Sequence, residues 1–268
     1  MQTNEKRERC VRILEEAASG GLCLAFSGGT DSSLLLKLSR EVSGRNGNLL
    51  WAVTFDTVLH PACDLEVASR VAKELGVRHQ VIHIDELQNP ALAKNPPDRC
   101  YLCKKTLFEK LFAFAAEKGL GTVLEGTNED DLHVYRPGLR AIREMGVLSP
   151  LAEAGLTKEE VRSWAAELGI SVASRPASPC LATRLPYGTE IDLELLGRIG
   201  RCEEALRKRG FRNVRVRVHG NILRLETDPE AFGELLRQRE EILQELRKTG
   251  PVYLTLDLEG FRSGSMDL

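Results

Sequence analysis

The sequence of 268 residues has no apolar run long enough to cross a bilayer, and its first ten residues, MQTNEKRERC, are too charged for a signal peptide. These absences predict a cytoplasmic protein without a membrane partner. Aromatic residues make up only 5% of the chain, which leaves little surface for stacking nucleic-acid bases. The formal net charge of -2 also argues against nucleic acid as a partner, apart from a local basic patch.

Motifs with the residue spacing of metal ligands are also scarce. The five histidines follow no metal-binding pattern, and neither a second CxxC nor a CxxH accompanies the one CxxC motif, so no four-ligand zinc site is complete. Seven cysteines without an export signal indicate reduced thiols, metal ligands or catalysis rather than disulfides. Four of them stand in apolar or helical contexts and are expected to be small buried residues: Cys10, Cys23, Cys63 and Cys202.

The remaining pattern alternates strands with helices. Apolar strand patterns at 22–26, 49–55, 79–84 and 121–126 are separated by helical patterns at 31–40, 63–76 and 104–118. This alternation predicts an α/β fold with a doubly wound parallel sheet covered on both faces. A further helix is expected at 157–169, where a threonine cap and an acidic first turn precede a terminal glycine.

The residue pattern changes at 173–192, a stretch that contains three prolines and little hydrophobic periodicity. This stretch is interpreted as a long loop at a domain boundary, with one domain over residues 1–185 and a second over 186–268. The second domain is predicted to be a small α+β unit, with a helix at 192–209, a strand pair at 213–226, a helix at 229–248 and a strand at 252–258.

The stretch SGGTDSS follows the first strand and opens the first helix. Two glycines let the backbone approach an anion, and the N–H groups at the helix start point toward it. Because the loop lacks the lysine of a Walker motif, it suits a pyrophosphate better. The arrangement resembles the signature of PP-loop ATP pyrophosphatases, which cleave ATP between its α and β phosphates. A turn that merely caps a helix is the alternative. The resemblance assigns ATP to Ser27, Gly28, Gly29, Thr30, Asp31, Ser32 and Ser33, with Asp31 also a candidate Mg²⁺ ligand.

The motif RCYLCKK places Cys100 and Cys103 two residues apart, and SPCLATR places Cys180 in the proline-bounded loop. A CxxC pair occurs in zinc sites, redox pairs and iron-sulfur clusters. Three thiolates without a fourth suit a 4Fe-4S cluster whose open iron takes a ligand such as sulfide. Alternatively, only Cys180 matters and the pair is incidental.

Five motifs, SGGTDSSLL, PPDRCYLCKKTLF, EGTNEDDLHVYRPG, SPCLATRLPYGTEI and GFRNVRVRVHGN, occur in this order. Over essentially the whole chain they resemble the LarE family, the sulfur transferases of nickel-pincer cofactor biosynthesis. The resemblance implies that ATP and Mg²⁺ activate the carboxylates of pyridinium-3,5-biscarboxylic acid mononucleotide as acyl adenylates, which are converted to thiocarboxylates. It also implies a homo-oligomer.

Two sulfur sources occur in this family. In one branch a single cysteine, at the position of Cys180, gives up its sulfur and becomes dehydroalanine. In the other branch three cysteines hold a 4Fe-4S cluster that carries an extra sulfide. The resemblance of Cys100, Cys103 and Cys180 to the second set implies the cluster branch, supplied by an external sulfide donor.

In NVRVRVHG, valines alternate with Arg215 and Arg217, so a strand would place the valines in the core and both guanidinium groups on one face. Two such groups form a fork suited to a phosphate monoester, and the resemblance assigns them to the substrate phosphate. A solvated strand face with salt bridges is the alternative.

Further candidates follow the strand at 121–126, at the carboxyl edge where open α/β folds bind ligands. The proposed roles are ATP or a second magnesium for Glu125, Thr127, Asn128 and Asp131, and the leaving pyrophosphate for Arg136 and Arg140. Elsewhere in the chain, Phe55 is a candidate for contact with adenine, Arg184 for contact with substrate or the Cys180 thiol, and Glu203 is a weak candidate for a metal contact. Caps, turns and core positions are the alternatives.

Two other functions fit part of the pattern. Related PP-loop enzymes that thiolate tRNA combine this loop with a CxxC and a distant cysteine, but they need a broad basic surface. A non-catalytic nucleotide-binding protein, or a structural metal protein, would use the CxxC pair for zinc.

Overall fold

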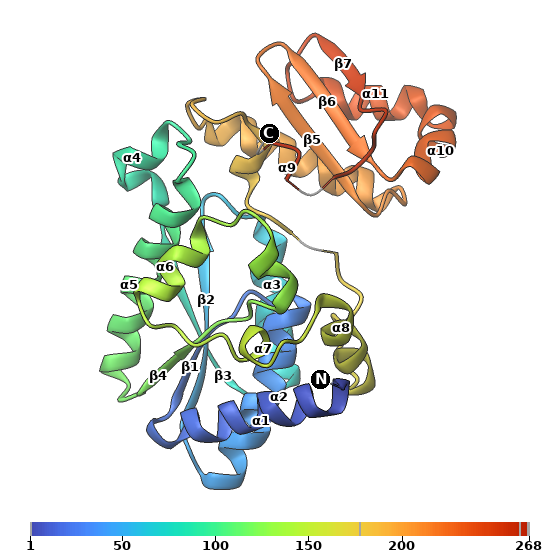
Figure 1. Ribbon diagram of the computed structural model, residues 1–268. Helices are drawn as coiled ribbons and strands as arrows, with labels where there is room; N and C mark the ends of the chain where they lie inside the picture. Colours follow the sequence, from blue (N-terminus) through green and yellow to red (C-terminus); the bar gives the residue numbers. More distant parts are fainter. Residues whose placement is uncertain (1, 177, 263, 267–268) are drawn as a thin grey trace. The chain divides into compact units, whose positions relative to one another are not determined.

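The computed structural model describes residues 2–176, 178–262 and 264–266 (Figure 1). The chain forms two compact units. Unit 1 comprises Met1–Thr57, Ala62–Glu86 and Asp98–Ser178, and unit 2 comprises Val58–Pro61, Leu87–Pro97 and Pro179–Leu268. The sequence prediction set the boundary after residue 185, whereas the units divide between Ser178 and Pro179 and two short earlier segments belong to unit 2.

Unit 1 contains a parallel sheet with the strand order β3-β2-β1-β4. Its strands are β1 Leu22–Ala25, β2 Leu50–Thr57, β3 Arg78–Ile84 and β4 Thr122–Leu124. Leu22 of β1 pairs with Leu50 on one side and with Thr122 on the other. The predicted parallel α/β fold is therefore confirmed. Because the chain leaves β3 at one edge and returns to β4 beyond β1, the order reverses between β1 and β4, where ligands bind in such folds.

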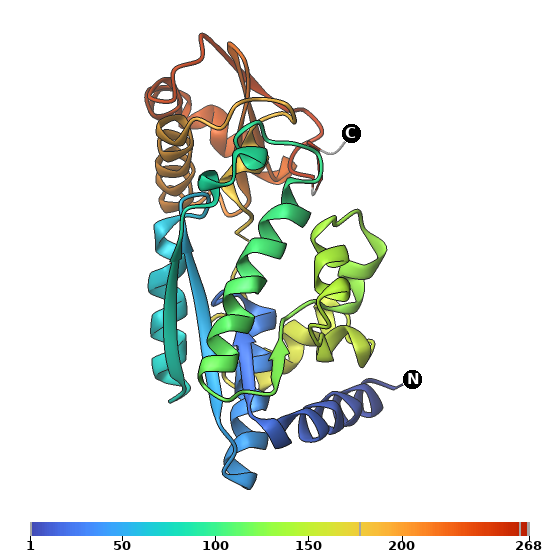
Figure 2. The ribbon, with the colours of Figure 1, turned by 90° about the vertical axis from the view of Figure 1, so that its left-hand side faces the viewer.

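Helices cover both faces of this sheet because side chains along each strand point alternately to opposite sides. Leu22 and Leu24 of β1 pack in one core, and Cys23 between them packs in the other. Figure 2 shows the sheet between α3 and α5, which contribute to different cores. The helices of unit 1 are α1 Thr3–Ala17, α2 Thr30–Asn46, α3 Ala62–Glu74, α5 Arg99–Glu117, α6 Gly138–Glu144, α7 Pro150–Glu153 and α8 Lys158–Glu167.

Unit 2 is built on a second sheet with the order β5-β6-β7, in which β5 and β6 are antiparallel and β6 and β7 parallel. Val214, Val216 and Val218 of β5 pack with α9 in one core, as the alternation predicts. Gly220, with φ of 59°, makes the turn between β5 and β6. The elements are α4 Pro90–Ala93, α9 Leu193–Lys208, β5 Val214–His219, β6 Ile222–Thr227, α10 Phe232–Arg237, α11 Arg239–Arg247 and β7 Tyr253–Leu256.

The helix predicted at 229–248 is wrong as a single element. A short 3-10 turn at Pro229–Ala231 precedes α10, and Gln238, with ψ of 20°, separates α10 from α11. The helical pattern of apolar residues continues across Gln238, so the sequence gives no sign of this break. No helix among the described residues is long and apolar enough to cross a membrane.

Candidate functional site

The loop between β1 and α2 makes a close backbone approach. Gly28 has φ of 69°, a conformation that side chains disfavour, and a Cβ placed there would lie 2.7 Å from the Ala68 Cα of α3. Gly29 is the N-cap of α2, so the first-turn N–H groups that follow it have no acceptor within the helix. These donors and the positive end of the helix dipole make the loop suitable for an anion.

Hydroxyl groups fix the shape of this loop. The Oγ atoms of Ser27 and Ser32 lie 3.1 Å apart, the Gly29 N–H donates to Ser27 Oγ at 3.3 Å, and Ser32 Oγ donates to the Gly29 carbonyl at 3.2 Å. Ser27 is exposed, whereas Ser32 and Ser33 are buried. The Thr30 hydroxyl donates to the Val172 carbonyl at 2.9 Å. That hydroxyl therefore anchors the start of α2 to the segment that follows α8.

The segment after β4 approaches the same loop. A Cβ on Gly126 would lie 3.0 Å from the Ser32 nitrogen, so only glycine permits this approach without displacement. Thr127 and Asn128 are buried, and Asn128 caps the 3-10 helix η3, Glu129–His133. The Glu125 carboxylate accepts from Ser149 Oγ at 2.5 Å and from the Thr127 N–H at 3.0 Å. The loop and this segment lie together at the point where the strand order reverses.

Asp31 has a cationic partner that the sequence prediction missed. Lys158 Nζ, at the start of α8, forms an ion pair with Asp31 Oδ2, and Asn128 Nδ2 donates to Asp31 Oδ1 at 3.5 Å. The loop itself lacks a lysine, but the fold brings one to it from 127 residues further along the chain. One sequence signal was available, because a lysine in the first turn of a helix stands where acidic residues are favoured.

Asp131 adds a second carboxylate to this neighbourhood. Burial raises the pKa of Asp131, Asp31 raises it further, and Arg136, the Asn128 backbone and Lys158 oppose the rise. Arg136 lies 2.9 Å from Asp131 and is about half exposed. Carboxylate and amide oxygens are the protein ligands that Mg²⁺ prefers. The Asn128 oxygen already accepts the Asp130 and Asp131 N–H groups, so the carboxylates of Asp31 and Asp131 are the oxygen donors here whose chemistry suits Mg²⁺.

Cys100 and Cys103 lie in the first two turns of α5, three residues apart and so on neighbouring positions of one helix face. Both are half-buried. The buried Arg99 guanidinium donates to Cys100 Sγ at 3.5 Å. Cys103 packs against the core on the α5 face of the sheet. The pair thus offers two thiols on one helix face, with a cation beside one of them.

The cysteines expected to be small core residues differ from this pair. Cys10, Cys23 and Cys202 are buried as predicted, and burial raises the pKa of each thiol to about 12. Such thiols do not readily form the thiolate that binds metal or attacks carbon. Cys63 is the exception to the prediction, because it is only half-buried at the start of α3.

Cys180 belongs to unit 2, where it precedes the 3-10 helix η4, Leu181–Arg184, and is half-buried. The Leu181 N–H donates to the Leu59 carbonyl at 2.8 Å, which explains why Val58–Pro61 belongs to this unit. The described residues contain no preformed group of three or more His, Cys, Asp or Glu side chains suited to hold a metal ion.

Arg184 is buried, with 1% of its surface exposed, and pairs in two places with Glu203 of α9. The distances are 2.7 Å from Nε to Oε1 and 2.9 Å from the terminal nitrogen to Oε2. Glu203 also accepts the Val216 N–H at 2.9 Å. Burial acts to raise the pKa of Glu203, but the hydrogen bonds and charge of Arg184 outweigh it and lower the pKa. Glu203 is thus a buried structural acceptor in this structure.

Both faces of β5 are buried, so the solvated face considered for Arg215 and Arg217 is not found. Arg217 binds Glu226 Oε2 at 3.0 Å and the Thr183 carbonyl at 2.8 Å. Arg215 donates to the Val214 carbonyl at 2.8 Å and lies over the Phe261 ring at 4.9 Å. Burial, followed by the charge of Arg184, lowers the pKa of Arg215 to about 10. The two guanidinium groups share a strand face, as predicted.

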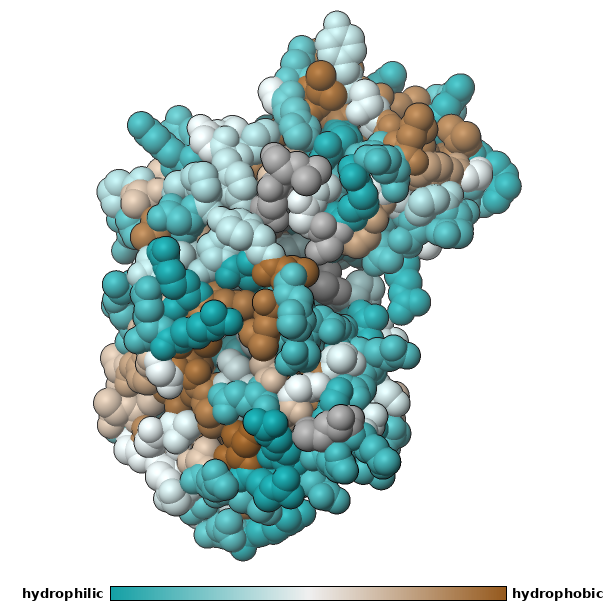
Figure 3. Space-filling view, in the orientation of Figure 1, coloured by the Kyte–Doolittle hydropathy of each residue, from teal (hydrophilic) through white to brown (hydrophobic). Residues whose placement is uncertain are grey.

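The remaining candidates occupy surface and core positions of unit 1. Phe55 packs near Phe108 of α5, with ring centroids 6.4 Å apart. Arg140 stacks on Tyr101 at 3.7 Å, next to the CxxC pair. Figure 3 shows apolar side chains gathered on one face of unit 1. A shallow pocket of about 330 Å³ is lined by residues of η3, α6 and the segment between them, including Arg136 and Arg140.

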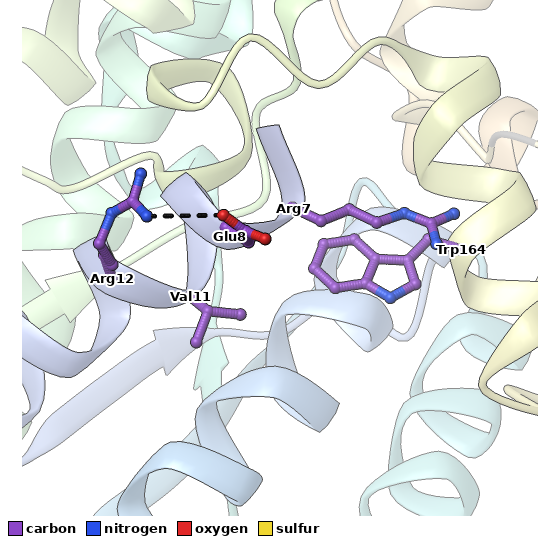
Figure 4. A pocket seen from close by; sticks show the side chains of 5 residues that line it. All are labelled: Arg7, Glu8, Val11, Arg12 and Trp164. Atoms are coloured by element: carbon purple, nitrogen blue, oxygen red, sulfur yellow. Dashed lines mark ion pairs between the residues drawn. The ribbon is translucent and has the colours of Figure 1, made fainter. Parts of the chain in front are cut away.

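Another shallow pocket, of about 380 Å³, lies between α1 and α8 (Figure 4). Arg7 covers the Trp164 ring at 5.2 Å and pairs with Glu167 at 2.6 Å. None of the lining residues belongs to the loop or to the other predicted sites. This pocket therefore has no part in the candidate site.

The chain is similar to one protein-family model and to several known proteins. The family model of NAD synthase matches residues 4–106. The chain is 41% identical to an uncharacterised protein of Synechocystis over 91% of both chains. It is 38% identical to pyridinium-3,5-bisthiocarboxylic acid mononucleotide synthase of Lactiplantibacillus plantarum, over 91% of this chain and 88% of that protein. It is also 28% identical to the NH3-dependent NAD+ synthetase of Aeropyrum pernix, over 69% of this chain and 65% of that protein.

Proposed function

Because the chain belongs to the LarE family of PP-loop enzymes, we propose that it is an ATP-dependent sulfur transferase acting on pyridinium-3,5-biscarboxylic acid mononucleotide. Its product would be the bisthiocarboxylic acid mononucleotide named in the Lactiplantibacillus relative. The observation that carries this proposal is the glycine loop at the sheet's switch point, with Asp31 and Lys158 paired beside it.

In the first step a substrate carboxylate oxygen attacks the α-phosphorus of ATP. The bond from that phosphorus to the bridging oxygen breaks, giving an acyl adenylate and pyrophosphate. The N–H groups of the Gly28–Ser32 loop would stabilise the charge that collects on the leaving pyrophosphate. Asp31 would hold Mg²⁺, and Lys158, released from Asp31, would add a cation at the phosphates.

In the second step sulfide attacks the acyl carbon, the carbon–oxygen bond to AMP breaks, and a thiocarboxylate forms. We assign Cys100, Cys103 and Cys180 to a 4Fe-4S cluster, which would supply a sulfide from its open iron. Adjacent half-buried thiols on α5 and the Arg99 cation beside Cys100 support this assignment. Loss of the Cys180 sulfur itself, with formation of dehydroalanine, is the alternative source.

We assign the substrate phosphate to the strand face that bears Arg215 and Arg217. Guanidinium groups bind phosphate oxygens through paired, charge-assisted hydrogen bonds. Arg217 already holds its guanidinium in a fixed orientation through Glu226, which reduces the entropy lost when an oxygen anion binds.

The test of the reaction is substrate-dependent pyrophosphate release. With Mg²⁺, ATP and the biscarboxylic mononucleotide, we expect AMP and pyrophosphate in equal amounts, and neither without the mononucleotide. The Asp31→Asn variant should lose this release. Release of ADP and inorganic phosphate, or a rate that ignores the mononucleotide, would contradict the proposal.

The test of the sulfur source is iron content and visible absorption of anaerobically purified protein. Replacing Cys100, Cys103 or Cys180 by serine should bleach a brown wild-type protein and remove its iron, whereas the half-buried Cys63→Ser control should keep both. Iron-free protein whose residue 180 loses the mass of hydrogen sulfide after turnover would instead establish sacrifice of the Cys180 sulfur.

A further inference from the structure

Lys158 stands at an unfavourable place in its helix and reaches the nucleotide loop from there. It is the first residue of α8, where the positive end of the helix dipole repels a cation. Its backbone N–H donates to Asp130 Oδ2 of η3 at 2.9 Å, and its Nζ donates to Asp31 Oδ2 of α2. The Asp31 carboxylate therefore gives the Lys158 ammonium group the counter-charge that its own helix denies it.

The Asp31 carboxylate has both of its oxygens engaged by donors of the protein. Oδ2 accepts from Lys158, and Oδ1 accepts from Asn128 Nδ2 at 3.5 Å. The side chains of Asp31 and Lys158 are 21% and 30% exposed, so the ion pair is partly shielded from water. Shielding makes such a pair stronger than one on the open surface. A divalent cation at Oδ2 would have to displace the Lys158 ammonium group.

Asp131, the second carboxylate, is engaged in the same manner. Arg136 lies 2.9 Å from its Oδ1, and the Asn128 N–H donates to its Oδ2 at 3.2 Å. Burial raises the pKa of Asp131, and the charge of Arg136 opposes this rise. The charge of Asp31 adds to the rise, and the charge of Lys158 opposes it. The two carboxylates and the two cations therefore lie close enough to act on one another.

The charge balance of this group disfavours a metal ion without a nucleotide. Each carboxylate already has a protein cation beside it, so bare Mg²⁺ would bring positive charge that no carboxylate is left to match. A complex of Mg²⁺ with ATP differs because it retains net negative charge. Its phosphate oxygens can accept hydrogen bonds from the ammonium and guanidinium groups of Lys158 and Arg136.

We propose that Lys158 excludes free divalent cations from Asp31 and yields this carboxylate only to a metal ion that arrives with the nucleotide. The inference rests on the proposed function and adds the exchange that precedes its first step. Lys158 moves from the Asp31 carboxylate to the phosphates, and the freed carboxylate oxygen becomes a ligand of the metal ion. Lys158 is thus a positioning residue for the metal ion as well as a cation for the phosphates.

The experiment measures binding of Mn²⁺, which takes the same oxygen ligands as Mg²⁺, to the full-length protein by electron paramagnetic resonance of the unbound ion. Without nucleotide, Lys158→Met should bind Mn²⁺ about 10-fold or more tightly than wild type, because Asp31 loses its cation. Lys158→Arg keeps a cation and should bind Mn²⁺ as weakly as wild type does. The double variant Lys158→Met, Asp31→Asn should lose the added affinity, which assigns it to Asp31.

The same variant should bind the nucleotide less tightly. Calorimetry with Mn²⁺ and α,β-methylene-ATP, an analogue that cannot release pyrophosphate, should show affinity about 5-fold or more below wild type for Lys158→Met, because the phosphates lose a cation. A structural defect would weaken both affinities, whereas the exchange predicts changes of opposite sign. Glu159→Gln, at the neighbouring exposed position of α8, is the control and should leave both affinities within about 2-fold of wild type.

Two outcomes would overturn the proposal in different ways. If wild type and Lys158→Met bind Mn²⁺ equally well without nucleotide, the exchange is wrong, and pyrophosphate release that still depends on Asp31 leaves the proposed function in place. If wild type with Mn²⁺ does not bind the analogue, the proposed function of the loop is wrong and the exchange with it. Circular dichroism checks that each variant is folded, and Lys158→Gln takes the place of Lys158→Met if the latter does not fold.

Discussion

The loop at Ser27–Ser33 and the strand face at Arg215 and Arg217 are both assigned to phosphate groups, yet they are built in opposite ways. The loop uses backbone N–H groups and small hydroxyls, and Ser27 is exposed. The strand face uses two arginines that are buried among carboxylates. Backbone donors carry no net charge, so the loop can stay open, whereas buried guanidinium groups need acid partners.

The largest expected effect is on the strand side. Glu203→Ala would leave the buried Arg184 without its bidentate partner, so the free energy of unfolding should fall by about 3–5 kcal/mol. Urea denaturation followed by circular dichroism measures this. The matched control is Glu167→Ala, which also breaks a bidentate arginine pair but at the surface, and should change stability far less. Equal losses of stability in the two variants would contradict the expectation that the buried pair matters more than the surface pair.

A smaller effect is expected at the loop. Lys158→Met should lower kcat/KM for pyrophosphate release about 100-fold, because the loop then loses the cation that is paired with Asp31. Lys158→Arg should keep part of the activity, and Glu159→Gln, at the neighbouring position, should keep nearly all. If Lys158→Met releases pyrophosphate at the wild-type rate, the backbone N–H groups of the loop stabilise the phosphates without help from Lys158.

The backbone conformation of Gly28 gives a further test of the loop, with a smaller expected effect. Gly28→Ala should cost about 1–3 kcal/mol and lower ATP-dependent activity, because its Cβ would overlap the Ala68 backbone. Gly76→Ala has a similar φ of 63° but open space around it, so thermal unfolding should show only the conformational cost, about 1 kcal/mol. Equal costs for both variants would mean that the approach to α3 is relaxed.

The smallest effect concerns pH. Burial acts to raise the pKa of Glu160, but hydrogen bonds from Lys6, the Thr157 backbone and Thr3 outweigh it and lower the pKa to about 2. Because the folded value lies below the unfolded one, Glu160 stabilises the fold above about pH 4.5, and this contribution is lost as the pH falls toward 2. Glu160→Gln should destabilise by less than about 1 kcal/mol at pH 7, and its difference from wild type should shrink below pH 4.

A pH-independent difference between Glu160→Gln and wild type would contradict this assignment. Denaturation of both proteins at pH 7, 4 and 3 measures how this difference in stability changes with pH. Glu8→Gln, whose carboxylate lies 3.8 Å from Arg12 on the exposed surface of α1, serves as the control for removing a surface charge.

The features that the sequence predicts are those set by local pattern. Alternating apolar runs indicate the four parallel strands, and the order of strand, glycine pair and helix marks the loop. The valine and arginine alternation at 214–217 likewise places the arginines on one face. These features follow from periodicity and from backbone conformation, which act over a few residues.

The features that the sequence does not predict depend on contacts between distant segments. Lys158 reaches Asp31 across 127 residues, and Glu226 reaches Arg217 through a cross-strand pairing. The sequence makes Glu203 only a weak candidate for a metal contact, because a lone helical glutamate is usually solvated, whereas the fold buries it against Arg184. Pairing of buried charges is decided by tertiary packing.

The most direct test of the central claim follows the carboxylate oxygen. The biscarboxylic mononucleotide is labelled with ¹⁸O in its carboxylates and incubated with ATP, Mg²⁺ and the protein, and the AMP product is analysed by mass spectrometry. Attack of a carboxylate on the α-phosphorus predicts one ¹⁸O in each AMP. Unlabelled AMP, or ADP in place of AMP, would show that no acyl adenylate forms and would contradict the account.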